Sequence, residues 1–466
     1  MTRGLCRTVL TSCPRRTLCT RGGTRFGYAS FAFGAISEEE ASKLDGPVLT
    51  PVGAERAGNK DGTIPAWTGV PIPMPKGFKS GSGNYINPFA DEKPLFSINQ
   101  KNMAQYADKL NDGVKVMMTR YPDYRIDVYK THRTTVYPQW LNDNAKKNAT
   151  ACHVTKKGLA VEGQGCHGGP PFPIPKEGLE VYWNHSMYYL VGKAANVDME
   201  NWNISSTGKA SLASRQQYII DSVWFDPERE NDWKTLNIFV TYVAPARRAG
   251  EMILLTYVRD YVDKELIVWQ YLPGQRRVRL APDVCCDTPS ASTGGASTYD
   301  DANVFLGNPK RFDWKIIGKK EMYIPYNVYR FMFHSGPEGE VLLKHFVNPD
   351  IVRWELHRVW KIEATLKPGM RHVYHKRIFY ADEDSWAFII GDNFDKRGNL
   401  YRMTLSNPFY MYDSKAFCMN PQTYYDLISN SYAIYGWTRG RVLQERVEKI
   451  PKDTFSPDAL AGGGLR

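Results

Sequence analysis

The stretch Tyr374–Trp386, YHKRIFYADEDSW, gathers two residue types that can do chemistry. Three consecutive carboxylates, from Asp382 to Asp384, follow His375 in it and His372 just before it. Two carboxylates about 5 to 10 Å apart, on opposite sides of a glycosidic bond, can act as its acid and base. Neighbours in a tight turn instead splay apart into solvent, and Asp and Ser are favoured in such turns. We therefore interpret ADEDS as a solvent-facing hairpin turn and predict no catalytic residue.

Three histidines, His357, His372 and His375, would form a metal site only if their side chains converged on one point. His357 lies on the polar face of its expected strand. His372 and His375 differ in parity, so they point to opposite faces of theirs. We predict no metal site from these histidines.

The sequence does not determine which cysteines form disulfides. Three of the eight lie near the N-terminus, and five remain for the folded part of the chain. An odd number leaves at least one thiol without a partner in the same chain. The Cys-His dipeptides at 152–153 and 166–167 lack the spacing of structural zinc sites, so a loop disulfide or two unrelated thiols compete with a metal there. The candidates for pairing are Cys152, Cys166, Cys285, Cys286 and Cys418.

Short catalytic motifs are missing from the sequence. It contains no G-x-S-x-G, no P-loop, no dinucleotide fingerprint and no H-E-x-x-H. The large serine-hydrolase, nucleotide-binding and zinc-protease classes are therefore disfavoured. We predict a protein that is not an enzyme and needs no cofactor, with an enzyme acting on a hydrophobic substrate as a minor alternative.

The net charge of +11 would suit a nucleic-acid partner, but much of it lies at the N-terminus. The first 37 residues contain six arginines and no acidic residue, and without them the net charge is +5. The clusters GQRRVRLA and HVYHKRIF alternate, so their basic side chains point to opposite faces of a strand. No continuous basic surface is predicted, and nucleic acid is not an expected partner.

Residues 1–36 are expected to be a cleavable targeting leader. Their Arg-rich, acid-free start is typical of an organellar transit peptide, whereas GYASFAFGA resembles the last part of a secretory signal. The compartment is therefore open between an organelle and export. No window of about 18 apolar residues exists, so no transmembrane span is predicted.

The remainder is expected to divide into an arm and one domain. Residues 37–96 begin with a short helix after Ser37 and continue as an extended arm rich in proline and glycine. Residues 97–466 are expected to form a single domain. Its clearest predicted helix starts near Ser97 or Asn99 and has apolar residues at helical spacing as far as Val114.

Two further segments follow before the strands begin. Residues 145–151 are interpreted as a short polar connection, and residues 177–185 as an amphipathic helix or strand. From Leu236 onward, LNIFVTYV, EMILLTYV, ELIVWQY and QRRVRLA are joined by short turns, which is typical of an antiparallel meander. Four more strands are predicted between Arg353 and Tyr412. The first of them, RWELHRVWKIEATL, has one apolar face, so it is expected to have one wet side.

Aromatic and aliphatic side chains on these strands are candidates for a ligand-binding wall. A curved sheet lined by them would enclose a cavity that suits a lipid-like ligand. The alternative is that they fill the core, as Trp and Tyr in strands more commonly do. The candidate cavity-lining residues are Trp269, Tyr271, Leu356, Trp360, Ile362, Ile378, Tyr380 and Trp386.

Several long motifs resemble one family. They include VGAERAGNKDGTIPAWTG, RYPDYRIDVYKTHRTTVYPQW, GPPFPIPKEGLEVYWNH, LPGQRRVRLAPDV and ELHRVWKIEATLKPGMRHVYHKRIFYADEDSW. In order from about Ser37 to the end, they look like the exported Gram-negative family of unknown function often labelled outer-membrane lipoprotein-sorting proteins. Residues 191–233 match that pattern less well, because they are rich in Asn and Ser where the family continues strands.

The resemblance implies an α+β, mainly antiparallel β fold similar to the lipoprotein carriers LolA and LolB. In that fold a strongly curved sheet forms an incomplete barrel, or half-barrel, which helices close over an apolar cavity. The resemblance also implies a location in the periplasm and no catalytic residues. We therefore expect a carrier of a lipid or other hydrophobic molecule that works with a membrane protein. The alternative is an accessory subunit whose Pro/Gly arm wraps a partner.

Overall fold

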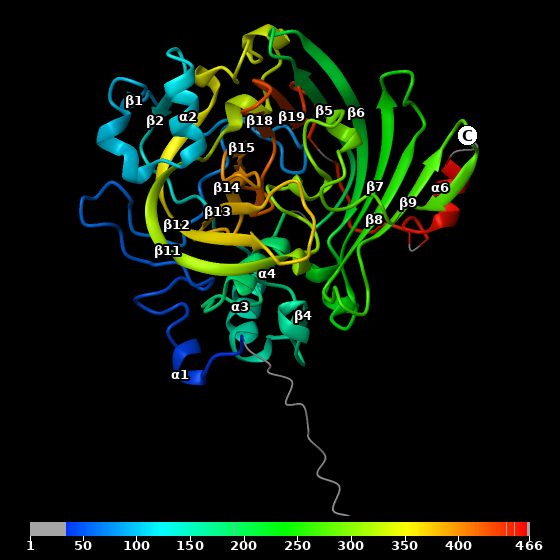
Figure 1. The fold of residues 1–466 in the computed structure, drawn as a ribbon. Coiled ribbons are helices and arrows are strands. Elements are labelled where there is room, and N and C mark those ends of the chain that lie inside the picture. Colours follow the sequence, from blue (N-terminus) through cyan, green and yellow to red (C-terminus); the bar gives the residue numbers. More distant parts are fainter. Residues whose placement is uncertain (1–33, 191, 444, 452, 464–466) are drawn as a thin grey trace, which may run out of the picture. The chain divides into compact units, whose positions relative to one another are not determined.

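One mainly antiparallel sheet organises the chain in this computed structural model, which describes residues 34–190, 192–443, 445–451 and 453–463 (Figure 1). Residues 32–466 form one compact unit. The main path of the sheet runs β1-β2-β12-β13-β14-β15-β18-β19-β5-β6-β7-β8-β9-β10, and β11 and β20 pair beside it with β12 and β5. The path ends at β1 and β10 without pairing them, so the sheet is not closed over the described residues.

Two meanders make up most of the sheet, and the sequence predicted the strands of the first and those of the second from β7 onward. The first is β12 to β15, and the second is β5 to β10. They meet where β19 pairs with β5, with Tyr432 opposite Ile204. The strands of the first meander and its neighbours are β11 (Phe312–Pro325), β12 (Arg353–Leu366), β13 (Lys376–Asp382), β14 (Phe388–Phe394), β15 (Leu400–Ser406), β18 (Gln422–Asp426) and β19 (Ser431–Trp437).

The second meander contains a hairpin of two long strands in the Asn/Ser-rich segment that matched the family pattern less well. Polar residues can occupy strands whose outer face is wet. Its strands are β5 (Lys193–Ile204), β6 (Ala210–Asp221), β7 (Lys234–Ala244), β8 (Met252–Val258), β9 (Ile267–Leu272) and β10 (Arg277–Leu280). The short strands are β1 (Phe96–Ile98), β2 (Ile126–Val128), β3 (His153–Thr155), β4 (Ala160–Glu162), β16 (Phe409–Met411), β17 (Ala416–Cys418) and β20 (Glu445–Arg446).

Two segments differ from the secondary structure expected from the sequence. The predicted helix through Val114 is divided into a 3-10 segment, Met103–Lys109, and α2, because backbone N–H groups at the start of α2 bond to Asp392. The expected connection at 145–151 is the second half of α3, whose buried Leu141, Ala145 and Ala149 form an apolar stripe. The helices are α1 (Glu38–Ala41), α2 (Asp112–Arg120), α3 (Gln139–Ala151), α4 (Gly178–Ser186), α5 (Tyr329–Met332) and α6 (Pro457–Gly463). None of the helices in the described ranges is long and apolar enough to cross a membrane.

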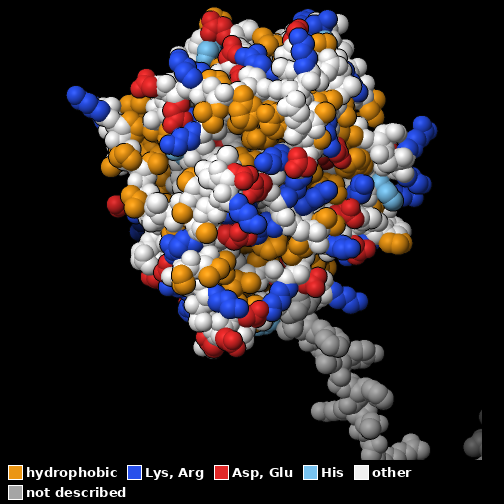
Figure 2. Space-filling view, turned by 90° about the vertical axis from the view of Figure 1, so that its left-hand side faces the viewer, with side chains coloured by type: hydrophobic (Ala, Val, Ile, Leu, Met, Phe, Trp, Pro, Cys, Tyr) orange, Lys and Arg blue, Asp and Glu red, His pale blue; other side chains and the backbone are white. Residues whose placement is uncertain are grey.

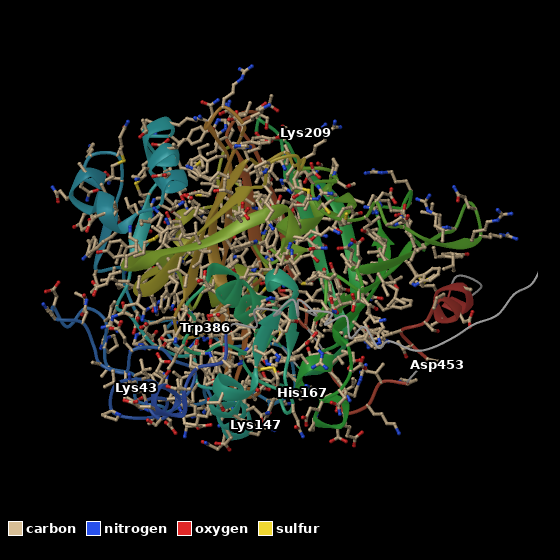
Figure 3. The ribbon with its side chains drawn as sticks, turned by 60° about the horizontal axis from the view of Figure 1, so that its bottom comes forward. Lys43, Lys147, His167, Lys209, Trp386 and Asp453 are labelled. Atoms are coloured by element: carbon tan, nitrogen blue, oxygen red, sulfur yellow. A yellow bond between two sulfur atoms is a disulfide. The ribbon has the colours of Figure 1, made fainter. Side chains whose placement is uncertain are left out.

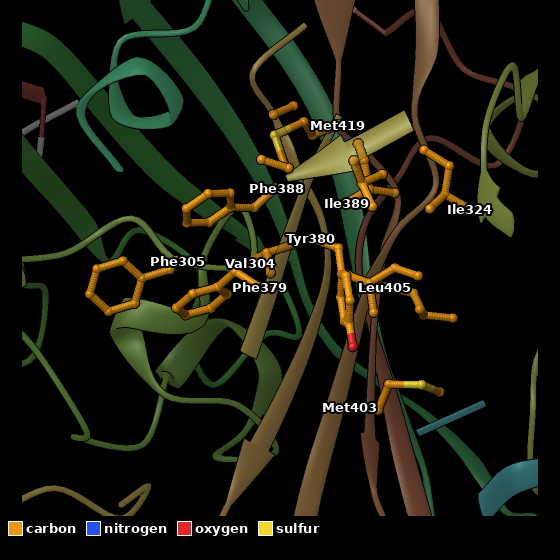
Figure 4. Packing of buried hydrophobic residues seen from close by; sticks show 14 of the residues in the cluster. Val304, Phe305, Ile324, Phe379, Tyr380, Phe388, Ile389, Met403, Leu405 and Met419 are labelled. Atoms are coloured by element: carbon orange, nitrogen blue, oxygen red, sulfur yellow. The ribbon is translucent and has the colours of Figure 1, made fainter. Parts of the chain in front are cut away.

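The largest hydrophobic cluster lies around β13 and β14. Phe379 stacks on Phe388 with ring centroids 4.8 Å apart and lies 5.6 Å from Phe305 (Figure 4). The expected wet side of β12 is wrong for the first half of the strand, because Glu355 and His357 on its polar face are only 0% and 1% exposed. In the second half, Lys361, Glu363 and Thr365 on the same face are partly exposed. Both edges of β12 are paired, and its polar face is covered by residues that bond to it.

The arm of residues 37–96 packs against its own chain. Ala54, Ile64 and Tyr85 are buried there. Trp386, which lies in the interior in Figure 3, donates a 2.9 Å hydrogen bond from Nε1 to the carbonyl of Val52. The arm therefore contributes to the protein's own interior, and the alternative in which it wraps a partner gains no support.

Cysteine pairing is settled for two residues. Cys152 and Cys166 form a disulfide, visible beside His167 in Figure 3, that joins the end of α3 to the following loop. Cys285, Cys286 and Cys418 are free thiols. The face drawn in Figure 2 carries basic and acidic side chains mixed with hydrophobic ones. The predicted leader lies almost wholly outside the described residues.

Candidate functional site

A cavity of about 120 Å³ lies on one face of the second meander. Its floor is formed by side chains of β5 to β8, β18 and β19, and its cover by a loop, residues 285–306, that we call the covering loop. The 3-10 turn Ala291–Thr293 within this loop contacts β5, β6 and β19. The cavity is lined by Leu190, Met199, Gln216, Tyr218, Ile220, Ile238, Val240, Tyr242, Ile253, Leu255, Tyr257, Ser290, Ser292, Ser297, Thr298, Tyr299, Ala302, Asn303, Leu306, Asn420, Tyr424 and Tyr435.

The floor follows directly from strand alternation. Every second residue of β6, β7 and β8 points into the cavity. The register places these residues opposite one another, with Ile220 beside Ile238 and Val240 beside Ile253. The intervening residue Phe239 points to the other face, where it packs in a separate cluster with Leu460 of α6.

All lining side chains are uncharged, and several of their polar groups bond to one another. The Tyr218 hydroxyl donates to Oε1 of Gln216 at 2.6 Å. Ser292 Oγ lies 3.0 Å from Gln216 Nε2 and 3.1 Å from the Tyr242 hydroxyl. Burial raises the pKa of Tyr435 to about 12, so this phenol stays neutral at physiological pH. The cavity therefore offers apolar walls and a few hydroxyl groups, but no charge to hold an ionised ligand.

Two aspartates anchor the covering loop to β13. Asp300 lies 3.0 Å from His372 and 3.3 Å from Arg377. Asp301 accepts hydrogen bonds from Arg377 at 2.7 Å and from the Tyr374 hydroxyl at 2.9 Å. Burial opposes ionisation of Asp300, but Arg377 and His372 outweigh it and lower its pKa to about 2. The Asp300 carboxylate that holds the loop is therefore ionised at physiological pH.

The eight residues predicted to line a cavity lie elsewhere. Tyr271 belongs to the small cluster with Leu460, and Trp269 packs against it. Trp360 and Trp386 lie beside each other with ring centroids 6.1 Å apart. None of the eight lines the cavity. Six of them belong to the main core or pack against it, and the other two belong to the small cluster with Leu460 or pack against it. Leu356, Ile362, Ile378, Tyr380 and Trp386 are members of the main core, and Trp360 packs against it.

The prediction of a solvent-facing turn after β13 is wrong. The turn exists, but Asp382, Glu383, Asp384 and Ser385 are at most 3% exposed. Arg133 donates to both carboxylate oxygens of Asp384, at 2.7 and 2.9 Å. The alternation of residues along the strand did not indicate that this turn is buried, because its cationic partner, Arg133, comes from a distant part of the chain.

Glu383 is held by three cations. Lys319 lies 2.9 Å from it, Arg358 lies 3.4 Å away and Arg133 lies 3.5 Å away. Burial raises its pKa against the effect of these cations. Because its charge is already paired, Glu383 is unsuited to act as a free catalytic base.

Asp382 differs from its two neighbours, since no Lys or Arg pairs with it among the described residues. Its Oδ2 accepts hydrogen bonds from Ser385 Oγ at 2.6 Å and from the Tyr326 hydroxyl at 3.3 Å. Burial and the nearby charge of Asp384 raise its pKa to about 6.

The three histidines considered as candidate metal ligands do not converge on one point. His357 lies beside Asp382, His372 binds Asp300 and His375 is exposed.

Together the open, mainly antiparallel sheet and the uncharged cavity define a mainly β protein with a cavity on one face of its sheet. The chain belongs to the family described as "Protein of unknown function (DUF1329)", whose model matches residues 97–461. It is 40% identical over 446 residues to a Pseudomonas aeruginosa protein named "Uncharacterized protein PA3922", covering 94% of this chain and 96% of that protein. The family resemblance drawn from the sequence is confirmed.

Solved structures with partial similarity include proteins from three bacteria. A DUF1329 family protein from Desulfovibrio piger is 13% identical with a TM-score of 0.39, over 56% of this chain and 90% of that chain. A putative outer membrane lipoprotein-sorting protein domain from Vibrio parahaemolyticus is 12% identical with a TM-score of 0.37, over 58% and 92%. The LolA superfamily protein NE2245 from Nitrosomonas europaea is 11% identical with a TM-score of 0.36, over 61% and 100%.

Proposed function

We propose that this protein is a non-enzymatic carrier that holds an acyl chain or another hydrophobic group in the cavity under the covering loop. The observation that supports this most directly is the uncharged floor, where aliphatic side chains of three register-matched strands point to one space. Such a surface favours apolar ligands, because burying each methylene contributes about 0.8 kcal/mol. The hydroxyl groups of Tyr218, Tyr242 and Ser292 would accept or donate to one neutral polar group of the ligand.

The size of the cavity limits what fits without movement. A volume near 120 Å³ is comparable to an apolar cavity of about 150 Å³ that holds benzene, and is smaller than the roughly 300 to 1,000 Å³ of common ligand sites. A whole acyl chain therefore requires the covering loop to move outward. We also propose that the sheet encloses the ligand as an incomplete barrel, with β5 and β6 forming its wall.

The proposed location is the periplasm, where the carrier would meet a membrane-protein partner. The Cys152–Cys166 disulfide supports this location, because disulfides persist in oxidising compartments. The organelle alternative is not supported, since the relative named above comes from a bacterium.

Ligand binding can be tested with a matched pair of variants. Leu255→Trp would fill the cavity, whereas Ile219→Trp places the same side chain on the opposite face of β6, beside the cluster of Leu460. Native mass spectrometry and uptake of a fluorescent fatty acid should show a ligand in the wild type and in Ile219→Trp. Leu255→Trp should lose at least tenfold in affinity. Absence of both co-purified ligand and uptake in the wild type would contradict the proposal.

A further inference from the structure

The buried turn after β13 contains one more carboxylate than it has basic partners. Asp382, Glu383, Asp384 and the adjacent Glu55 supply four carboxylates, and the cations that pair with the last three are Arg133, Lys319 and Arg358. The unpaired carboxylate is Asp382, which is 0% exposed. Its Oδ1 has no hydrogen-bond partner among the described protein atoms. Burying a carboxylate oxygen without a hydrogen-bond partner costs free energy, so a cation or a proton donor bound to this Oδ1 would stabilise the folded protein.

His357 presents a nitrogen to that same oxygen. Its Nε2 lies 3.1 Å from Oε2 of Glu355, and its Nδ1 lies 4.0 Å from Oδ1 of Asp382. Glu355 accepts hydrogen bonds at both carboxylate oxygens, from Arg353 at Oε1 and from the His132 amide at Oε2. Because Glu355 is the acceptor of these bonds, Nε2 of His357 donates to it and carries the proton. In the neutral ring, Nδ1 is then a bare acceptor that faces another acceptor.

Asp384 completes the group. One ligand atom each from His357, Asp382 and Asp384 lie within 4.8 Å of one another, and all three residues are buried. Arg133 occupies one lone-pair direction of each Asp384 oxygen, but a carboxylate has about four such sites and can bind a cation with the remainder. The arrangement of Glu355 behind the imidazole is also the common support of a metal-binding histidine, because it fixes the tautomer and the ring orientation.

We propose that His357 Nδ1, Asp382 and Asp384 bind a divalent transition-metal ion of the Zn²⁺ or Mn²⁺ class. Imidazole combined with carboxylates suits these ions. The separation of 4.0 Å between Nδ1 and Oδ1 is too long for a hydrogen bond. Two ligand atoms of one tetrahedral ion lie roughly 3.4 Å apart when each bond is about 2.0 to 2.1 Å, so binding requires these two side chains to move slightly closer together. This site is separate from the ligand cavity, whose lining contains none of these residues.

The surroundings indicate a structural ion and not a catalytic one. The ring of Tyr326 stacks on His357 with centroids 3.9 Å apart. The arm closes the other side, where the Glu55 amide donates to Glu383 at 3.3 Å and Val52 binds Trp386. A closed site of this kind leaves no room for substrate, and it would hold β12, the turn and the arm together.

Metal content tests the proposal directly. The full mature protein is refolded from denaturant with Zn²⁺ alone or Mn²⁺ alone, desalted and measured by inductively coupled plasma mass spectrometry. We expect about one ion per chain in the wild type and at least a tenfold loss in Asp382→Asn and His357→Gln. Asp392→Asn is the matched control, because Asp392 is equally buried and both of its oxygens have hydrogen-bond partners.

If a variant does not fold, measurements on the wild type alone still test the proposal. Removal of the ion by a chelator during refolding should lower the midpoint of thermal unfolding, and X-ray absorption of the loaded protein should show nitrogen and oxygen ligands at about 2.0 to 2.2 Å. A wild type that retains less than a tenth of an equivalent of either ion would overturn the proposal and leave a proton or a water molecule beside Asp382. Full retention in both ligand variants would overturn it as well.

Discussion

Asp300 and His372 join the loop that covers the cavity to the start of β13. Nδ1 of His372 accepts a 3.0 Å hydrogen bond from the Tyr374 amide, so its Nε2 donates to Asp300. A residue that first looked like a candidate metal ligand is therefore part of the attachment of a loop. Because the proposed ligand would have to pass this loop, we expect the contact to affect the rate of ligand entry as well as stability.

Replacing His372 should loosen the covering loop. His372→Ala leaves Asp300 with Arg377 and Thr298 but removes one buried charge-assisted bond, which costs about 1.5 to 3 kcal/mol. Stopped-flow uptake of a fluorescent fatty acid should become several-fold faster, and urea unfolding should report the loss of stability. His375→Ala is the control, since His375 is exposed. Equal uptake rates in both variants would show that the loop does not limit entry.

Removing Arg133 should be far more damaging than removing an exposed cation. Its side chain is 2% exposed and is the ion-pair partner of Asp384 among the described residues. Arg133→Ala leaves a buried carboxylate uncompensated, which costs about 3 to 5 kcal/mol. Lys115→Ala breaks an exposed pair with Asp112 and should cost at most about 1 kcal/mol. The free energies of unfolding in urea compare the two, and similar losses would contradict the assignment of Arg133 to the interior.

Asp392 should make the protein less stable as the pH rises. Burial raises its pKa from the ordinary value of 3.8 to about 6, so the folded state binds more protons than the unfolded state between these values. Its stabilising effect is therefore present below pH 4 and is lost as the pH rises through 6, by roughly 3 kcal/mol for a shift of about two units. The difference in unfolding free energy between the wild type and Asp392→Asn should fall across this window. A constant difference would show that Asp392 titrates normally.

Local sequence patterns predicted the sheet better than they predicted the site. The alternation in β7 and β8 indicated strands, and the register followed from short turns. It did not indicate which face forms the cavity, because Phe239 and Val240 make both faces of β7 apolar. Burial of the turn at Asp382 depends on Arg133, which is separated from it by about 250 positions, so no local pattern contains that information. The stripe of Leu141, Ala145 and Ala149 was present in the sequence, but the polar residues between them obscured it.

The packing of the arm gives a prediction based on two glycines. Gly53 and Gly62 both have positive φ, of 90° and 70°, which any side chain at these positions would strain by about 1 to 2 kcal/mol. A Cβ at Gly53 would also lie 1.7 Å from the carbonyl oxygen of Pro173, whereas a Cβ at Gly62 would meet nothing within 4 Å. Gly62→Ala should therefore cost only the strain, whereas Gly53→Ala should displace residues 50–57 and expose the buried turn that they cover.

Hydrogen exchange of the arm separates these outcomes. In Gly53→Ala the amides that bond within the arm and to the turn, such as those of Ala54 and Glu55, should lose protection by at least tenfold. In Gly62→Ala they should exchange as in the wild type. If Gly53→Ala kept full protection, the contact with Pro173 would have to relax at little cost, and the arm could not be a fixed part of the interior. Loss of protection in Gly53→Ala alone would instead show that one close backbone contact keeps Glu55 over Glu383.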